Sequence, residues 1–265
     1  MSFTLPSFAK LNLDLRVIGK RDDGYHELFT VFQSVSLFDE ISFAEGNLID
    51  LTCNDSNVPT DGRNLIVKAA DILRERFGVT VGAKMHLRKR IPAPGGLGGG
   101  SSNAAVALTG LTRLWHLDIS FEMMLEIAGE IGSDVPFFLY GGTAMGFGRG
   151  TRIEPIPDIR AEYLLIVTPD VHISTADAFR DLNAANLTSG NSESILVNCR
   201  FNAESLDLRH AALKNDFESS VFISHPQIAL VKQTLLDLGA VNALMSGSGA
   251  SVFAVFDKEE TRQTA

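Results

Sequence analysis

Five glycines lie close together in segment 91–108, between a basic run and an apolar run. Glycine accepts positive φ and lets a ligand approach the main chain closely. Ser101, Ser102 and Asn103 follow, all of them types favoured at a helix N-cap, and apolar residues then recur at helical spacing through 104–115. Such a loop directs several N–H groups and the positive end of a helix dipole at one point. The segment therefore predicts an anion site, most often for phosphate; the alternative is a flexible turn before a core helix.

Two common nucleotide-binding motifs are excluded. A Walker A loop requires lysine where this chain has Ser101, and Gly-x-Gly-x-x-Gly fails because Gly96 and Gly98 are followed by Ser101 at the third position. Any phosphate held here is held by another type of loop.

Two further positions have side chains suited to chemistry. Asp134 precedes an apolar run that begins with Val135 and Pro136, so it is either a helix cap with proline in the first turn or a perturbed, catalytic carboxylate. Tyr25 and His26 follow a turn cluster, where they either stack on and hydrogen-bond to a base or merely start a strand. Both pairs of alternatives remain open.

The first element that positions these residues is a strand over 8–17, because apolar and polar residues alternate there. Lys10 and Asn12 share one face, opposite Leu11 and Leu13. The pattern favours a solvated sheet face for Lys10 and Asn12, and it places the two on the same side.

The remaining pattern predicts further elements. Helices are expected at 64–77 (with Gly78 just past its end), 120–131, 174–180, 206–217 and 226–238, and strands at 28–38, 79–90, 163–168 and 243–256. A loop or short strand is expected at 47–63 and a glycine-rich strand or hairpin at 141–150. A domain junction is expected at 153–159, a polar loop at 183–193 and a second small glycine loop at 245–251. The basic run Arg88, Lys89 and Arg90 either attracts an anion or is solvated.

Overall composition narrows the class of protein. The net charge of −9 over 265 residues disfavours a nucleic-acid partner, and no apolar run approaches the length of a membrane span or forms a signal peptide. Cys53 and Cys199 lie far apart, which suits a reducing cytoplasm and provides no disulfide or zinc framework. The six scattered histidines argue against a dedicated metal cage.

Segment 92–105, Pro-x-x-x-Gly-Leu-Gly-Gly-Gly-Ser-Ser-Asn-Ala-Ala, resembles the phosphate loop of the galactokinase, homoserine kinase, mevalonate kinase and phosphomevalonate kinase (GHMP) superfamily. Supporting blocks are Ala-Lys-Leu-Asn-Leu at 9–13, Arg-Asp-Asp-Gly-Tyr-His-Glu-Leu at 21–28, Gly-Ser-Asp-Val-Pro at 132–136, Asn-Asp-Phe-Glu at 215–218 and Ser-Gly-Ser-Gly at 246–249. Pro94 stands where the resemblance leads us to expect a small residue or glycine. The sequence also ends at Ala265, before an expected final helix and strand.

The resemblance implies an α+β GHMP kinase fold with two domains. Residues 1–153 are expected to form an ATP-binding domain like domain 2 of ribosomal protein S5. Residues 154–265 are expected to form a ferredoxin-like, substrate-binding domain, with the active site in the cleft between the two.

The resemblance also implies an activity. The block at 21–28 is similar to a branch of the family that uses ATP to phosphorylate the 2-hydroxyl of a cytidyl diphosphate-linked methylerythritol, in the non-mevalonate route to isoprenoid precursors. Asp134 is expected to act as general base, and Lys10 as the cation that keeps Asp134 ionised and polarises the hydroxyl. Mg²⁺ is expected to bridge the ATP phosphates, through Ser101 or Ser102.

The binding residues implied by the resemblance form two sets. ATP is expected to contact Pro92, Ala93, Pro94, Gly95, Gly96, Leu97, Gly98, Gly99, Gly100, Ser101 and Ser102. The substrate is expected to contact Asn12, Tyr25, His26, Thr175, Phe179, Ser246 and Gly247. Within the second set, His26 would read the cytosine edge, while Tyr25 and Phe179 stack on the ring.

Three other functions remain as alternatives. One is another kinase of the same superfamily, acting on homoserine, mevalonate or a sugar; Tyr25 and His26 argue against it because they suit a nucleobase. Another is a non-catalytic nucleotide-binding regulator, against which the presence of both Lys10 and Asp134 argues. An RNA-binding protein is disfavoured by the negative charge.

Overall fold

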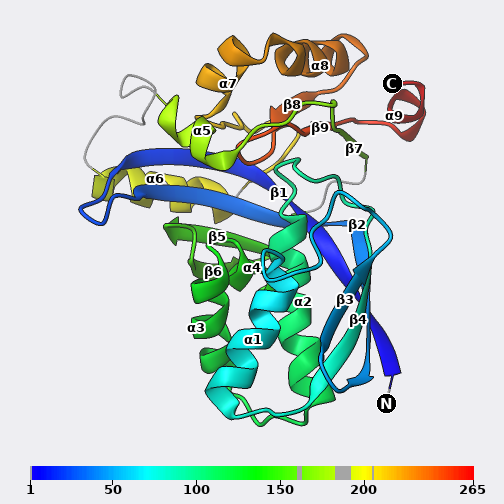
Figure 1. Ribbon diagram of the computed structural model, residues 1–265. Helices are drawn as coiled ribbons and strands as arrows, with labels where there is room; N and C mark the ends of the chain where they lie inside the picture. Colours follow the sequence, from blue (N-terminus) through cyan, green and yellow to red (C-terminus); the bar gives the residue numbers. More distant parts are fainter. Residues whose placement is uncertain (1, 160–162, 183–191, 205) are drawn as a thin grey trace. The chain divides into compact units, whose positions relative to one another are not determined.

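The computed structural model describes residues 2–159, 163–182, 192–204 and 206–265, and its helices and strands form an α+β fold (Figure 1). The chain divides into two compact units. Unit 1 contains residues 1–10, 35–93 and 98–141, and unit 2 contains residues 11–34, 94–97 and 142–265. The boundary expected after residue 153 stays a prediction.

The strands are β1 (Ser2–Lys20), β2 (His26–Gly46), β3 (Ile49–Cys53), β4 (Gly82–Arg88), β5 (Thr143–Gly148), β6 (Arg152–Ile156), β7 (Leu164–Val167), β8 (Asn242–Met245) and β9 (Val252–Val255). The helices are α1 (Leu65–Phe77), α2 (Gly99–Leu114), α3 (Phe121–Ile131), α4 (Val135–Tyr140), α5 (Thr175–Arg180), α6 (Ser192–Glu204), α7 (Glu218–Ser224), α8 (Pro226–Asp237) and α9 (Glu259–Thr264).

Unit 1 is a sheet covered on one face by helices. The second half of β2 pairs antiparallel with β4, and β4 pairs parallel with β3. Apolar residues of these strands form one buried cluster with α1, α2, α3 and the start of α4, and Figure 1 shows α1 and α2 lying beside this sheet. Burial of this helix-facing surface is the main stabilising term for the unit.

The predicted helix after Asn64 is confirmed as α1. The Asn64 side chain accepts a hydrogen bond from the N–H of Ile66, and Gly78 ends the helix at φ 64°. Both ends are therefore specified by local chemistry: an N-cap side chain and a glycine in the left-handed region.

The helix after the glycine loop begins earlier than its cap types suggested. α2 starts at Gly99, its N-cap is Gly98 at φ 69°, and no side chain caps it. Ser101, Ser102 and Asn103 consequently lie in its first turns. The wrong residue was predicted as the cap because glycine also serves at an N-cap, and here it adopts a conformation that other residues rarely accept.

The predicted strand over 8–17 is confirmed and extended as β1, but the solvated face expected for its polar residues is wrong. Lys10 and Asn12 are each 3% exposed, as deeply buried as their apolar neighbours. Alternation reveals which residues share a face, whereas burial of the polar face depends on what other parts of the chain place over it.

In unit 2 the first half of β2 pairs antiparallel with β5, and β5 pairs with β6. The first residues of the segment expected as a domain junction, 153–156, form part of β6, and the junction itself stays a prediction. Pro155 lies opposite Ala144 in this ladder. Because β6 is an edge strand, a residue without an N–H is tolerated there.

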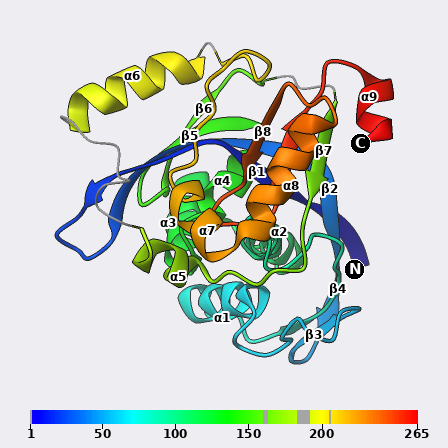
Figure 2. The ribbon, with the colours of Figure 1, turned by 90° about the horizontal axis from the view of Figure 1, so that it is seen from above.

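A second sheet in unit 2 has the order β7–β9–β8. The strand predicted over 243–256 is two strands, β8 and β9, separated by the second glycine loop, and they pair antiparallel. Figure 2 shows α8 lying along this sheet, where Ile228 and Leu235 join the buried cluster that also contains Met245 and Val252. The predicted helix 226–238 is confirmed as α8.

The helix predicted over 206–217 is wrong, because this segment forms turns between α6 and α7. The Asp207 carboxylate accepts a hydrogen bond from the N–H of Arg209 and contacts the ring of His210 (2.7 Å), which stabilises a tight turn. Of the polar loop predicted at 183–193, residues 183–191 lie outside the described residues and the last two belong to α6. Across the described chain, no helix combines the length and apolar character that crossing a membrane requires.

Candidate active site

The predicted catalytic residues Lys10 and Asp134 lie together in unit 1. Lys10 Nζ is 3.5 Å from Asp134 Oδ2, and the side chains are 3% and 35% exposed. Burial lowers the pKa of Lys10, and the charge of Asp134 opposes that shift. The result is an ion pair whose cation is enclosed and whose carboxylate reaches solvent.

Asp134 occupies the position predicted for a helix cap, but its carboxylate does not cap. It is the N-cap residue of α4, with Pro136 in the first turn, and its side chain makes no capping hydrogen bond in the described chain. The carboxylate instead pairs with Lys10. The turn and proline therefore set the backbone at Asp134, and the carboxylate is directed to the lysine.

Gly98 lies directly against the Lys10 side chain. A Cβ on residue 98 would stand 3.0 Å from Lys10 Cε and 2.7 Å from Phe138 Cζ, and φ is 69°. Only glycine meets both conditions without displacing Lys10. The start of the predicted ATP helix and the predicted catalytic pair are thus in contact within one unit.

The N-terminus of α2 has the geometry of a phosphate cradle. Its first helical hydrogen bond runs from the N–H of Ser102 to the carbonyl of Gly98 (2.9 Å). The N–H groups of Gly99, Gly100 and Ser101 come before this bond, at the positive end of a 16-residue helix. Donors in this position suit a phosphate oxygen.

The earlier part of the glycine loop belongs to unit 2, where it packs on the second glycine loop. Ser246 Oγ donates to the carbonyl of Gly96 (3.0 Å), and the N–H of Ser251 donates to the carbonyl of Gly95 (3.1 Å). A Cβ on Gly96 would lie 2.1 Å from the Ser246 carbonyl oxygen. The N–H of Asn12 donates to Ser246 Oγ (3.2 Å), so three of the predicted binding segments are joined here.

The block Asn-Asp-Phe-Glu at 215–218 holds the second glycine loop in shape. Asn215 Nδ2 donates to the carbonyls of Met245 (2.7 Å) and Gly247 (2.8 Å), and the N–H of Met245 donates to the Glu218 carboxylate (2.9 Å). Asp216 accepts from the N–H of Val17 (2.7 Å). The block therefore fixes the conformation of the second glycine loop through these hydrogen bonds.

The block at 21–28 forms the turn between β1 and β2. Arg21 pairs with Asp23 (3.1 Å) and Glu27 (2.5 Å), and the N–H of Tyr25 donates to Asp23 (3.1 Å). Gly24 adopts φ 84°. These bonds set the hairpin tip so that Tyr25 is exposed beside His26.

The residues predicted to bind the base, Tyr25, His26 and Phe179, all lie in unit 2. His26 stacks on Phe179 with ring centroids 5.1 Å apart and planes at 21°. Burial lowers the pKa of His26, with a further contribution from Lys20, which favours the neutral ring. Tyr25 is covered on one side by the Arg149 guanidinium, 4.0 Å from the ring centroid. Stacking on cytosine stays a prediction.

Arg149 is a residue that the sequence interpretation missed. Its Nε is buried and has no hydrogen-bond partner among the described residues. A donor in that state beside Tyr25 is suited to a ligand acceptor. The sequence feature that could have revealed Arg149 is its place in the glycine-rich run 141–150.

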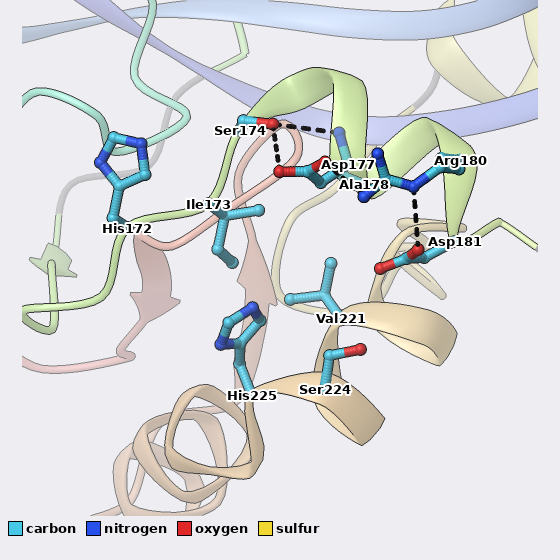
Figure 3. Close-up of a pocket in the computed structure, with 10 residues that line it drawn as sticks. All are labelled: His172, Ile173, Ser174, Asp177, Ala178, Arg180, Asp181, Val221, Ser224 and His225. Carbon is cyan, nitrogen blue, oxygen red and sulfur yellow. Dashed lines mark hydrogen bonds and ion pairs between the residues drawn. The ribbon is translucent and has the colours of Figure 1, made fainter.

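α5 carries Thr175 and Phe179, and it borders two different features. The Thr175 hydroxyl lies 3.1 Å from that of Ser248, in the second glycine loop. A pocket of about 300 Å³ also adjoins α5 (Figure 3), lined by His172, Ile173, Ser174, Asp177, Ala178, Arg180, Asp181, Val221, Ser224 and His225. In it, the Ser174 hydroxyl donates to Asp177 (2.6 Å) and caps the helix. The predicted substrate residues are not among its lining.

The described residues contain no group of three or more His, Cys, Asp or Glu able to hold a metal ion. Of the two serines predicted for Mg²⁺, Ser102 is 1% exposed and accepts a hydrogen bond from Ser7 (2.8 Å), so it does not fit. Ser101 is half-buried in the first turn of α2. With Ser101 as the one remaining candidate of the two serines, this site fits a magnesium ion that would be bound mainly by the phosphates of ATP.

Comparison with known proteins agrees with this geometry. The family model "GHMP kinases N terminal domain" matches residues 64–142, and "GHMP kinases C terminal" matches residues 199–265. A 4-diphosphocytidyl-2-C-methyl-D-erythritol kinase of Solibacter usitatus is 43% identical over 95% of this chain and 80% of its own length. A kinase of the same name from Caldanaerobacter subterraneus is 38% identical over 98% of this chain and 90% of its own length.

A solved structure gives the same result. The crystal structure of a 4-(cytidine 5'-diphospho)-2C-methyl-D-erythritol kinase matches with a TM-score of 0.80 and 29% identity, over 99% of this chain and 93% of that one. The predicted GHMP kinase fold is confirmed, and the chain is a phosphotransferase. The chain belongs to the GHMP kinase family, in its branch of 4-diphosphocytidyl-2-C-methyl-D-erythritol kinases.

Proposed function

We propose that the protein transfers the γ-phosphate of ATP to the 2-hydroxyl of 4-diphosphocytidyl-2-C-methyl-D-erythritol, forming ADP and the 2-phosphate. The observation that carries this proposal is the Lys10–Asp134 ion pair, which lies against Gly98 at the N-terminus of α2. Base, cation and phosphate cradle are the parts that phosphoryl transfer requires.

The geometry supports a division of roles. Asp134 takes the proton of the 2-hydroxyl, whose oxygen then bonds to the γ-phosphorus as the bond to the β-phosphate bridging oxygen breaks. Lys10 stabilises Asp134 as a carboxylate and offsets negative charge on the attacking oxygen. The N–H groups of Gly99, Gly100 and Ser101 hold phosphate oxygens. Ser101 would hold a Mg²⁺ ion bound together with ATP, and that ion would offset the charge of the phosphates.

Residues 92–97 would contact ATP through their main chain, both in the exposed part at 92–94 and at Gly95 and Gly96, which pack on the second glycine loop. Exposed Pro94 restricts the backbone there without entering a helix or strand.

Substrate binding is assigned to unit 2. We assign the cytosine ring to Tyr25, His26 and Phe179. A neutral His26 can both donate to and accept from a base edge. Asn12, Thr175, Ser246 and Gly247 would contact the remaining polar groups.

The proposal includes a cytoplasmic location. It is supported by the thiols of Cys53 and Cys199, neither of which is in a disulfide.

ADP release, measured with a panel of alcohols, tests the proposal. We expect turnover with the cytidyl substrate, and kcat/KM for homoserine, mevalonate and galactose lower by at least about a thousandfold, since binding the base positions the reacting hydroxyl. Equal turnover of one of the small alcohols would contradict the substrate, and no ADP release with any of them would contradict the reaction. Relatives at 38–43% identity favour the cytidyl substrate over the other kinase alternatives.

A further inference from the structure

Asp39, on β2, is a buried carboxylate that the reaction itself does not use. It is fully buried and accepts four hydrogen bonds. Oδ1 accepts from the N–H groups of Arg90 (2.7 Å) and Ile91 (2.8 Å), and Oδ2 accepts from Lys89 Nζ (2.7 Å) and Asn103 Nδ2 (2.9 Å). Such complete pairing is what stabilises a charge removed from water.

The four donors come from both sides of the glycine loop. Arg90 and Ile91 are the residues at which the chain leaves β4 for the loop, and Asn103 lies near the start of α2. The second hydrogen of Asn103 Nδ2 is donated to Ser7 (2.8 Å), whose own hydroxyl donates to Ser102 (2.8 Å). One carboxylate therefore fixes the two ends of the loop relative to each other.

Lys89 takes part in the same network. Its side chain is 5% exposed, and its ammonium also donates to the carbonyl of Ile91 (2.7 Å). The solvated charge run predicted for this segment is thus wrong for Lys89, whereas Arg88 and Arg90 do lie nearer solvent and pair with Glu40. The Lys89 ammonium would lie 2.9 Å from a Cβ on Gly99, so the network reaches the first residue of α2.

We propose that Asp39 is the positioning residue of the phosphate loop: through Arg90, Ile91 and Asn103 it sets the spacing at which the α2 N–H groups meet ATP. The inference rests on the proposed function, because it presumes that this loop binds ATP. A carboxylate is required since all four of its partners are donors, and an amide at this position would turn an N–H towards other N–H groups.

The test is Asp39→Asn, with KM measured separately for ATP and for the cytidyl substrate. We expect KM for ATP to rise and kcat to fall, giving a loss of about ten- to a hundredfold in kcat/KM for ATP, because small misplacement of positioning groups has effects of that size. KM for the cytidyl substrate should stay within twofold of the wild-type value. Asn64→Ala is the matched control: it removes the α1 cap in the same unit, and it should lower thermal stability while leaving both KM values unchanged.

Two further variants keep the test decisive. Asn103→Ala leaves the Asp39–Lys89 pair intact and removes the link to α2 together with the hydrogen bond to Ser7. It should show the same selective rise in KM for ATP even if Asp39→Asn fails to fold. The exchange Asp39→Asn with Asn103→Asp returns one carboxylate and one amide to the contact beside Lys89, and should recover at least a third of the lost kcat/KM for ATP.

The outcomes separate the two levels of proposal. A wild-type protein that releases no ADP contradicts the proposed function. An active wild type whose Asp39→Asn and Asn103→Ala variants lose thermal stability, but keep the wild-type KM for ATP, overturns the role of Asp39 alone.

Discussion

Lys10 and Asp134 form a pair with unequal access to solvent: the lysine side chain is 3% exposed and the carboxylate 35%, with 3.5 Å between Nζ and Oδ2. A base must exchange its proton with substrate and solvent, whereas a cation that offsets charge acts best when it is enclosed in a low dielectric. The unequal burial therefore matches the two proposed roles.

Asp134→Asn is expected to keep the fold and to lower kcat by about 10²- to 10⁴-fold, the usual contribution of a positioned base. The amide is nearly isosteric but cannot accept the proton, so KM for ATP should change little. Steady-state kinetics with ATP varied at saturating cytidyl substrate would measure this. A variant with near-normal kcat would rule out Asp134 as the base.

Gly98→Ala is expected to impair turnover severely, since the new Cβ would stand 2.7 Å from Phe138 and 3.0 Å from Lys10 at a φ of 69°. Both the clash and the backbone strain act beside Lys10, the proposed catalytic cation. Gly129→Ala is the control, because residue 129 lies inside α3 with nothing within 4 Å of a Cβ. It should raise the free energy of unfolding by about 0.5–1 kcal/mol and leave kcat unchanged. Similar kinetics for the two variants would contradict the packing argument.

Tyr25→Ala should raise KM for the cytidyl substrate by about tenfold, as loss of one aromatic–base stacking contact costs about 1–3 kcal/mol. KM for ATP should remain at the wild-type value, because Tyr25 lies at the hairpin tip of unit 2 and outside the glycine loop. Tyr25→Phe, which keeps the ring, serves as the control. Equal increases in the two KM values would argue against base stacking.

Asp14 is expected to make stability depend on pH. Burial raises the pKa of Asp14 to about 6 from 3.8, against the opposing charge of Arg16, while Asp216 raises it and Lys214 lowers it. Because the folded pKa exceeds the unfolded one, native Asp14 takes up its proton first as pH falls, so its contribution to stability increases from pH 8 towards pH 4.

Chemical unfolding of wild type and Asp14→Asn across pH would isolate this contribution. Between pH 8 and pH 5 the stability of the wild type relative to the variant should improve by about 1 kcal/mol. Parallel curves for the two proteins would show that Asp14 does not titrate as expected.

Sequence patterns predicted best the features that neighbouring residues determine. The helices predicted over 64–77 and 120–131 are confirmed, as is the glycine predicted just past the first, Gly78. The Asn64 and Ser120 side chains cap these helices within one turn, so the ends depend on local residues. The helix expected over 206–217 failed for the opposite reason. Asn215 donates to the carbonyls of Met245, at the end of β8, and Gly247, in the loop after it, and no local pattern reveals these distant partners.

The candidate site shows the same division. Contact between Lys10 and Asp134 was expected from resemblance and is confirmed as a geometry, with its catalytic role still a prediction. Asp39 and Arg149 were missed because a charged residue in an alternating or glycine-rich segment looks like a solvent-facing residue. Their importance depends on donors and rings supplied from more than 50 and more than 100 residues away.

The contact between Gly96 and the second glycine loop has a consequence for genetics. The atom that a side chain at residue 96 would strike is the carbonyl oxygen of Ser246, which belongs to the main chain. Every amino acid at position 246 places that oxygen there, so no replacement of Ser246 can act as a suppressor of a substitution at Gly96. Selection for revertants of Gly96→Ala should therefore return glycine itself, or changes that move the backbone, and never a compensating exchange at position 246.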